Sequence, residues 1–109
     1  MIVKIKPLSV NQAWQGKRFK TNKYKAYEKE LLLILPKDVY IPGGEMSLCL
    51  IFGFSSKLSD FDNPVKPFVD CLQKRYKFND RMIKRCLIDV MEVKKGEEFI
   101  DFTMADLNS

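Results

Sequence analysis

The segment Met46-Ser47-Leu48-Cys49-Leu50-Ile51-Phe52-Gly53-Phe54 is rich in apolar residues and decides the predicted fold. Such a nearly continuous apolar run is typical of a β-strand that is covered on both faces. Gly53, inside the run, indicates a bulge or the close approach of another backbone. A short polar stretch then leads to Asp60 and Asp62. These carboxylates therefore lie between a strand and the next element, where α/β proteins tend to place functional groups.

A helix is predicted after Asn63, because Asn63-Pro64 is typical of a cap followed by a first-turn proline. Pro67 leaves a later start open, since proline lacks a backbone donor and disfavours the helical conformation of the residue before it. The apolar side of this helix is formed by Val65, Phe68, Val69 and Leu72, and another side carries Lys66, Asp70 and Lys74. The basic residues 74–77 suit the negative end of the helix dipole.

The residues before this segment predict a strand, a loop and a helix. Residues 2–6 alternate apolar with basic and predict a strand with Val3 and Ile5 facing inward. Residues 7–21 have no regular pattern. Their basic and aromatic residues suit a contact with a nucleic-acid backbone, and many merely solvated loops have the same composition. Thr21 or Asn22 is expected to cap a helix that Pro36 closes, with a buried stripe formed by Tyr24, Tyr27, Leu31 and Leu35.

The end of the chain predicts a turn and a hairpin. A short turn or helix is expected over 78–84, and the strands 86–93 and 99–104 are expected to pair as a hairpin around Gly96. The length of 109 residues suits one domain, 1–109, with a single core. The predicted fold is α+β, with one mixed β-sheet packed by two main helices in the order βαβαββ.

The charge balance favours a polyanionic partner. Nineteen basic residues against fourteen acidic ones give a net charge of +5, and the chain contains no histidine. The absence of histidine excludes His general bases, Ser/His/Asp and Cys/His nucleophilic sites, and His-ligated metal centres. Any catalytic chemistry must therefore depend on carboxylates, lysines and a metal ion.

The cysteines and the hydropathy bear on the location of the protein. Cys49, Cys71 and Cys86 form no CxxC pair, and their apolar neighbours predict small buried thiols rather than disulfides or a zinc site. No apolar run reaches the roughly 18 residues that a membrane span needs. We expect a cytoplasmic protein with no membrane partner.

The aspartates and lysines suggest metal-dependent chemistry on phosphate. Asp60 and Asp62 could flank one Mg²⁺ or Mn²⁺ ion, and Asp80 could approach it from the opposite side. Lys66 would supply a cation for the charge that develops on a phosphodiester. The alternative is that this Asp-x-Asp pattern only caps the helix and favours its dipole. The working hypothesis is a small metal-dependent nuclease.

The combined motif resembles the RusA family of Holliday junction resolvases. Its residues are Asp60-x-Asp62-Asn63-x-x-Lys66-Pro67, then Asp70-x-Leu72 and Asn79-Asp80. The opening Pro7-Leu8-Ser9-Val10-Asn11, with Gly16-Lys17-Arg18 and Thr21, is also similar to that family. The resemblance spans most of the chain. It departs from the family at Asn79, where an aspartate is common.

The resemblance implies a homodimeric endonuclease, usually encoded by a phage or prophage, that nicks four-way DNA junctions symmetrically with Mg²⁺ or Mn²⁺. By position, Asp60, Asp62 and Asp80 match the catalytic and metal-binding carboxylates, and Lys66 matches the catalytic lysine. Asp70 matches a further acid with a secondary role, as a ligand, a support or a packing residue. The basic residues expected to hold the DNA backbone are Lys17, Arg18, Lys20, Lys23, Lys74, Arg75 and Lys77.

Three other functions remain open at this stage. The chain could be a nuclease acting on other branched DNA, such as flaps or forks. It could be a non-catalytic DNA-binding module whose aspartates serve as caps. It could also be a structural dimerisation protein with an incidental basic surface. Metal-dependent nicking and a preference for junctions over duplex DNA separate these functions from a resolvase.

Overall fold

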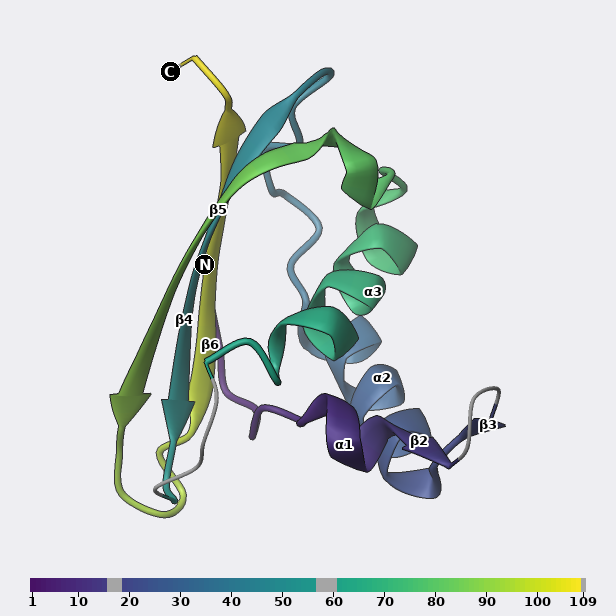
Figure 1. Ribbon diagram of the computed structural model, residues 1–109, viewed down its shortest axis with the longest axis vertical. Coiled ribbons are helices and arrows are strands. Elements are labelled where there is room, and N and C mark those ends of the chain that lie inside the picture. The colour runs from purple at the N-terminus through teal and green to yellow at the C-terminus, as the bar shows by residue number, and fades with distance from the viewer. Residues whose placement is uncertain (16–18, 57–60, 109) are drawn as a thin grey trace.

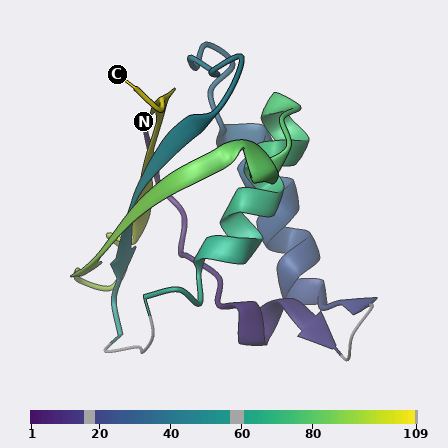
Figure 2. The ribbon, with the colours of Figure 1, turned by 45° about the horizontal axis from the view of Figure 1, so that its top comes forward.

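The computed structural model describes residues 1–15, 19–56 and 61–108, and it has an α+β fold with one mixed main sheet. The main sheet contains β1 (Ile2–Val3), β4 (Met46–Phe54), β5 (Ile83–Glu92) and β6 (Phe99–Asp106). Its two main helices are α2 (Asn22–Ile34) and α3 (Val65–Tyr76). Both helices lie on the same side of the sheet, as Figures 1 and 2 show. The predicted fold class is therefore confirmed.

The segment between β1 and α2 is more structured than its sequence indicates. It contains the short helix α1 (Val10–Ala13) and a small two-stranded ladder of β2 (Trp14–Gln15) and β3 (Phe19–Lys20). Val3 and Ile5 are buried as predicted, although β1 ends at Val3. None of the helices in the described ranges has the length and hydropathy needed to cross a bilayer.

β4 is the central strand, and its position corrects the predicted hairpin. The strand order is β1-β6-β4-β5, so β4 pairs in parallel with β5 and antiparallel with β6. β5 and β6 therefore do not pair with each other. The connection 93–98 is long enough for the chain to cross over one strand. In the central position β4, the most apolar strand, forms backbone hydrogen bonds with a neighbour on each of its two edges. Figure 1 shows β4 between the two.

The sheet buries one face and leaves the other partly open. On the helix side, Leu48, Leu50 and Phe52 are buried. Phe68 of α3 packs edge-on against Phe52 and Phe102, with ring centroids 6.1 and 5.7 Å apart. These aromatic contacts fix α3 against the middle of the sheet. The predicted covering of both faces of β4 is wrong, because no described helix packs on the face that carries Cys49, whose side chain is exposed.

Gly53 meets a side chain rather than another backbone. A methyl group added at Gly53 would collide with the ring of Phe99, the residue opposite it on β6. The close approach that the sequence indicated is therefore made by an aromatic ring that covers the glycine. The strand keeps its register with β6 through this position, so Gly53 is not a bulge.

α2 forms as predicted because its cap and its apolar stripe agree. The Thr21 hydroxyl accepts a hydrogen bond from the Tyr24 backbone N–H at 3.1 Å, which is the expected N-cap contact. Tyr24, Tyr27 and Leu31 are buried on the side that faces the core. The helix ends at Ile34, just before Leu35 and Pro36.

α3 begins earlier than the later of its two predicted starts. Its first residue is Val65, Pro64 stands at the N-cap position, and Pro67 lies buried within the first turn. A proline is tolerated there because the first N–H groups of a helix have no intrahelical acceptor. Lys77 ends the helix with a left-handed conformation at φ 59°, and its N–H donates to the Gln73 carbonyl at 2.8 Å.

The prediction of buried cysteines is right for one residue only. All three thiols are free, but Cys49 and Cys86 are exposed, and Cys71 alone is buried. Cys49 points to the open face of β4, whereas Cys86 lies on the outer strand β5. Burial raises the pKa of the Cys71 thiol to about 12, which keeps it protonated and unreactive.

Candidate active site

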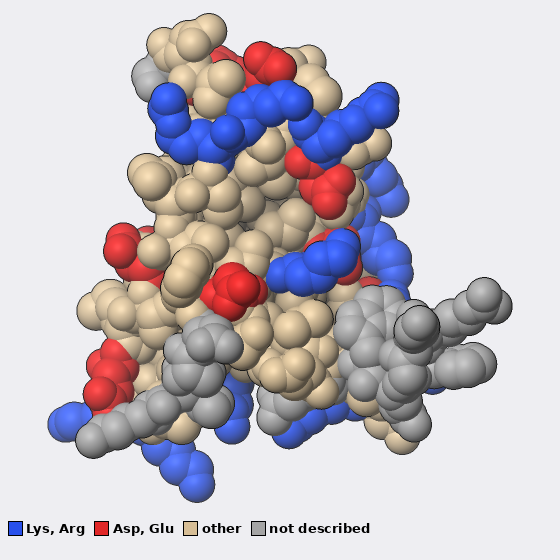
Figure 3. Space-filling model, viewed as in Figure 1, with Lys and Arg blue, Asp and Glu red and all other residues tan. Residues whose placement is uncertain are grey.

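Three of the four predicted catalytic residues line one hollow between α3 and β5. Asp62, Lys66 and Asp80 share this hollow of about 400 Å³ with apolar side chains of both elements. The residues that complete its wall are Leu48, Val65, Val69, Ile83, Cys86 and Ile88. Figure 3 shows the same face, where acidic and basic side chains surround a largely uncharged area. Asp60 lies outside the described residues.

A turn before α3 presents Asp62. The carbonyl of Asp62 accepts a hydrogen bond from the Val65 N–H at 3.1 Å, which closes the turn. The carbonyl of the next residue, Asn63, accepts from the Val10 N–H at 2.8 Å. The backbone is thus anchored to α1 while the Asp62 side chain stays exposed. The two parts of the sequence that resemble the RusA family therefore meet at Asn63.

Asp70 orients Lys66 within α3. The Lys66 ammonium donates to the Asp70 carboxylate at 3.0 Å, across one helical turn. The Tyr24 hydroxyl and the Gln73 amide lie 3.5 and 3.4 Å from the same carboxylate. Burial, and then the charge of Asp70, raise the pKa of the Tyr24 phenol well above its ordinary value, so it stays a donor. These contacts suit a supporting role, which is one of the three roles left open for Asp70.

Gln73 connects the helix to the segment that carries Asp80. Its side-chain oxygen accepts a hydrogen bond from the Asp80 backbone N–H at 2.9 Å. Asp80 opens the 3-10 helix η1 (Asp80–Met82), and the Asn79 side chain caps it by accepting from the Arg81 N–H at 3.0 Å. Asn79 thus performs a capping role that a neutral amide fulfils well. Sequence reasoning missed Gln73; its only signal is its place three residues after Asp70 on the helix.

The hollow contains two of the three carboxylates that the predicted metal site requires. Within the described ranges, no three His, Cys, Asp or Glu side chains converge closely enough to hold a metal ion. Asp62 and Asp80 nevertheless line the same hollow. Magnesium usually binds one or two carboxylates and takes its remaining oxygens from water and substrate phosphate. The donor set of the hollow agrees with that chemistry.

The predicted DNA-binding lysines and arginines fall into distinct groups. Lys17 and Arg18 lie outside the described residues. Lys20 and Lys74 both bind Glu28, at 2.9 and 2.8 Å, so this pair of cations ties β3 and α3 to α2. The remaining three are Lys23 and Lys77, which are exposed, and Arg75, which lies over the Tyr76 ring at 5.8 Å.

Exposed basic residues also continue beyond the predicted set, around the start of β5. Figure 3 shows a band of basic side chains across the end of the molecule where α3 ends and β5 begins. Arg81, Lys84 and Arg85 are exposed in this segment, close in sequence to Asp80. Sequence reasoning missed them because it considered basic residues only in the segments 17–23 and 74–77. Arg81 and Lys84 extend the positive charge near Asp80, whereas Arg85 lies on the face of β5 away from the helices and the hollow.

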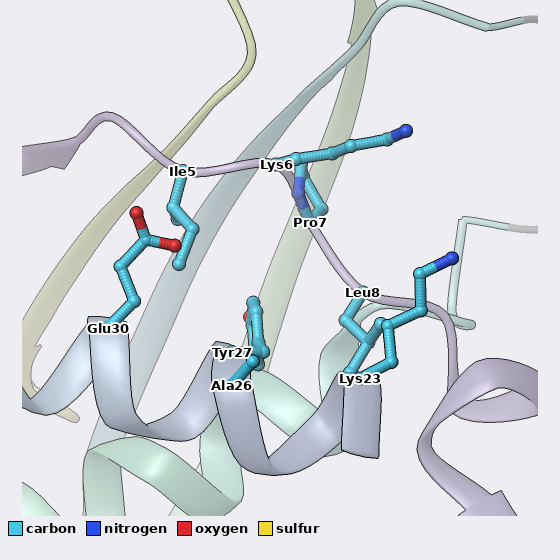
Figure 4. Close-up of a pocket in the computed structure, with 8 residues that line it drawn as sticks. All are labelled: Ile5, Lys6, Pro7, Leu8, Lys23, Ala26, Tyr27 and Glu30. Carbon is cyan, nitrogen blue, oxygen red and sulfur yellow. The ribbon is translucent and has the colours of Figure 1, made fainter. Parts of the chain in front are cut away.

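A second hollow lies between the amino-terminal segment and α2 (Figure 4). It has a volume of about 220 Å³. Its described walls are mostly apolar, and Glu30 is their one carboxylate, with Lys6 and Lys23 as the cations. One carboxylate among apolar side chains lacks the paired acids of the α3–β5 hollow, so the latter is the better candidate site.

No protein-family model matches this chain, and no curated protein matches its sequence. The resemblance to the RusA family therefore depends on the motif residues alone. The geometry adds that three motif residues from two segments, 62–66 and Asp80, line one hollow.

Proposed function

We propose that this protein is a metal-dependent, structure-specific endodeoxyribonuclease that resolves Holliday junctions by paired, symmetric nicks. One observation carries the proposal. A single accessible hollow is lined by Asp62 and Lys66, which are close together on the chain, and by Asp80, which follows the end of α3. Capping residues without a common task have no reason to converge in this way. The RusA-like motif in which these residues occur supports the same function.

The chemistry follows from the charges of the hollow. Asp62 and Asp80 would hold Mg²⁺ or Mn²⁺, which when bound makes water more acidic and withdraws charge from the phosphorus oxygens. The Lys66 ammonium would pair with a non-bridging oxygen of the scissile phosphate, where negative charge grows in the transition state. Asp70 keeps that ammonium in one orientation through the 3.0 Å contact. Gln73 holds the backbone of Asp80.

The surface around the hollow suits a DNA backbone. The net charge of +5 favours a polyanion, and the exposed basic residues at the start of β5 lie next to Asp80 in the sequence. Phosphate contacts of this kind position DNA without reading its bases. Two symmetric cuts also require two equivalent sites, which a homodimer with a two-fold axis provides.

The direct test is incubation of the purified protein with a synthetic four-way junction, with Mg²⁺ or with a chelator. We expect nicks at symmetric positions on opposed strands, only with the metal. A linear duplex, a flap and a fork of the same sequences serve as controls. Equal cutting of flaps or forks would assign the chain to a broader class of branched-DNA nucleases. Salt-sensitive binding of DNA without any nicking would indicate a non-catalytic DNA-binding module.

A further inference from the structure

β5 is a long outer strand with an open edge. It spans Ile83–Glu92, and in the described part of the chain only β4 pairs with it. Figure 1 shows no element beside its other edge. Three of its apolar side chains, Leu87, Val90 and Met91, are 58, 40 and 49% exposed. Outer strands of this length with exposed apolar residues pair readily with another strand, unless charges or bulges prevent it.

The charges of β5 are self-complementary about Leu87. Arg85 lies two residues before Leu87 and Asp89 lies two residues after it, so the three side chains share one face of the strand. That face is the one away from the helices, because Leu87 is opposite the exposed Cys49. Both Arg85 and Asp89 are exposed. Neither forms an ion pair with any other residue that the structure describes.

We propose that two copies of this chain pair antiparallel through β5, about a two-fold axis at Leu87. Each Leu87 then faces the partner's Leu87, and Arg85 faces the partner's Asp89 on both sides of the axis. Directly opposed residues of opposite charge stabilise antiparallel pairs, whereas like charges destabilise them. A register centred on Ile88 would instead oppose Leu87 to the partner's Asp89, so the register centred on Leu87 matches better.

This pairing has a consequence for the candidate site. A two-fold axis through an antiparallel strand pair is perpendicular to the sheet, so both copies keep their helices on the same face. The result is one continuous sheet with two copies of the α3–β5 hollow. Cys86 and Ile88 of β5 line that hollow, so the two hollows lie on either side of the central strand pair. The expectation that both hollows face one DNA junction rests on the proposed function.

A charge exchange tests the interface. The molar mass in solution is measured by light scattering for the wild type and for Arg85→Asp, Asp89→Arg and the double variant that carries both changes. The chain has a mass of 12.7 kDa, and we expect the wild type at twice that value. Each single variant opposes like charges and should be monomeric. The double variant restores both pairs and should be dimeric. Lys94→Asp, in the exposed loop after β5, makes the same change of charge as Arg85→Asp and should stay dimeric.

Several results would overturn the interface: a monomeric wild type, or single variants that remain as dimeric as Lys94→Asp. Circular dichroism identifies a single variant that fails to fold. A cross-linking experiment then tests the interface without the charge variants. Leu87→Cys, in a background with Cys49→Ser and Cys86→Ser, is mildly oxidised. We expect a covalent dimer, since the two residues at the axis are directly opposed. A chain that stays uncrosslinked in this assay overturns the proposed register.

The outcome is independent of nuclease activity, because mass and cross-linking need neither DNA nor metal. A dimer that fails to cut junctions would support the β5 interface and contradict the proposed function. A monomer that cuts junctions in pairs would do the reverse.

Discussion

The backbone N–H of Asp80 donates a hydrogen bond to the side-chain oxygen of Gln73, with the two atoms 2.9 Å apart. The amide nitrogen of Gln73 lies 3.4 Å from the Asp70 carboxylate, which in turn binds Lys66. One glutamine thus links the lysine of the candidate site to one of its carboxylates. The geometry of the hollow depends on this short chain of contacts, most of it within α3.

Replacing Gln73 should therefore weaken cleavage without weakening DNA binding. Gln73→Ala removes the acceptor for Asp80, and we expect the rate of junction cleavage to fall by about tenfold, the usual loss when a supporting contact is removed. Gln73→Glu keeps an acceptor for the Asp80 N–H but places a second carboxylate beside Asp70, so it should also cut more slowly than the wild type. Single-turnover cleavage at saturating magnesium measures both. Equal rates for all three proteins would show that Gln73 supports nothing in the reaction.

Asp62→Asn should abolish cutting and preserve or strengthen junction binding. The substitution removes a proposed metal ligand and also a negative charge from the surface that we propose faces the DNA phosphates. The Asp62 side chain is exposed, so the fold should not change. Gel-shift binding in a chelator and cleavage in magnesium are measured side by side. Asp38→Asn, at another exposed aspartate, is the matched control and should cut like the wild type.

Lys66→Ala should impair cleavage by on the order of 100-fold, because it removes the cation that we propose stabilises transition-state charge. The stability of the protein should change little. Lys66 is 61% exposed, and exposed ion pairs one helical turn apart contribute only about 0.3–0.5 kcal/mol. Urea denaturation checks the second statement. A variant that cuts normally would remove Lys66 from the reaction.

The Glu28 ion pairs should make stability depend on pH. Burial alone would raise the pKa of Glu28, but hydrogen bonds from Lys74 and Lys20 outweigh it and lower the pKa below its ordinary 4.5. A carboxylate with a lowered pKa stabilises the fold above the unfolded pKa, and this contribution is lost as the pH falls through the folded value. We expect Glu28→Gln to lower the free energy of unfolding by about 1 kcal/mol at pH 7 and by less near pH 3.

Urea denaturation at both pH values tests this dependence. Glu30→Gln, at an exposed glutamate of the same helix, should change stability little at either pH. A loss that is equal at pH 7 and pH 3 for Glu28→Gln would mean that its effect comes from packing rather than from charge.

Gly53→Ala should destabilise the protein by about 1–3 kcal/mol through overpacking against the Phe99 ring. Phe99→Leu opens space at the same point, so the double variant should lose less than the sum of the two single losses. Thermal or urea unfolding of the four proteins forms a double-mutant cycle. Strict additivity would show that Phe99 moves aside at no cost.

The sequence predicted local elements better than their pairing. Thr21 and the stripe from Tyr24 to Leu31 were sufficient to place α2, because a cap and a helical period act within one segment. The partners of β4 could not be deduced in the same way. β5 and β6 are adjacent along the chain and flank the turn around Gly96, which suits a hairpin, yet long-range burial of β4 decides the order.

In the candidate site, too, local patterns were predictable from the sequence and long-range contacts were not. The types and spacing of Asp62, Lys66 and Asp80 predicted that they act together, and they line one hollow. The contact between Gln73 and Asp80 depends on where the chain turns after α3, which no local pattern specifies. The pairing of Lys20 and Lys74 with a single glutamate likewise needs α2 and α3 to pack side by side.

The central place of β4 also bears on how the protein folds during its synthesis. Both neighbours of β4 are encoded after it, and its antiparallel partner β6 ends at Asp106. A nascent chain that has emerged from the ribosome only as far as α3 holds this apolar strand with neither partner available. Its sheet must therefore assemble late, and until then the segment is exposed to chaperones and to aggregation.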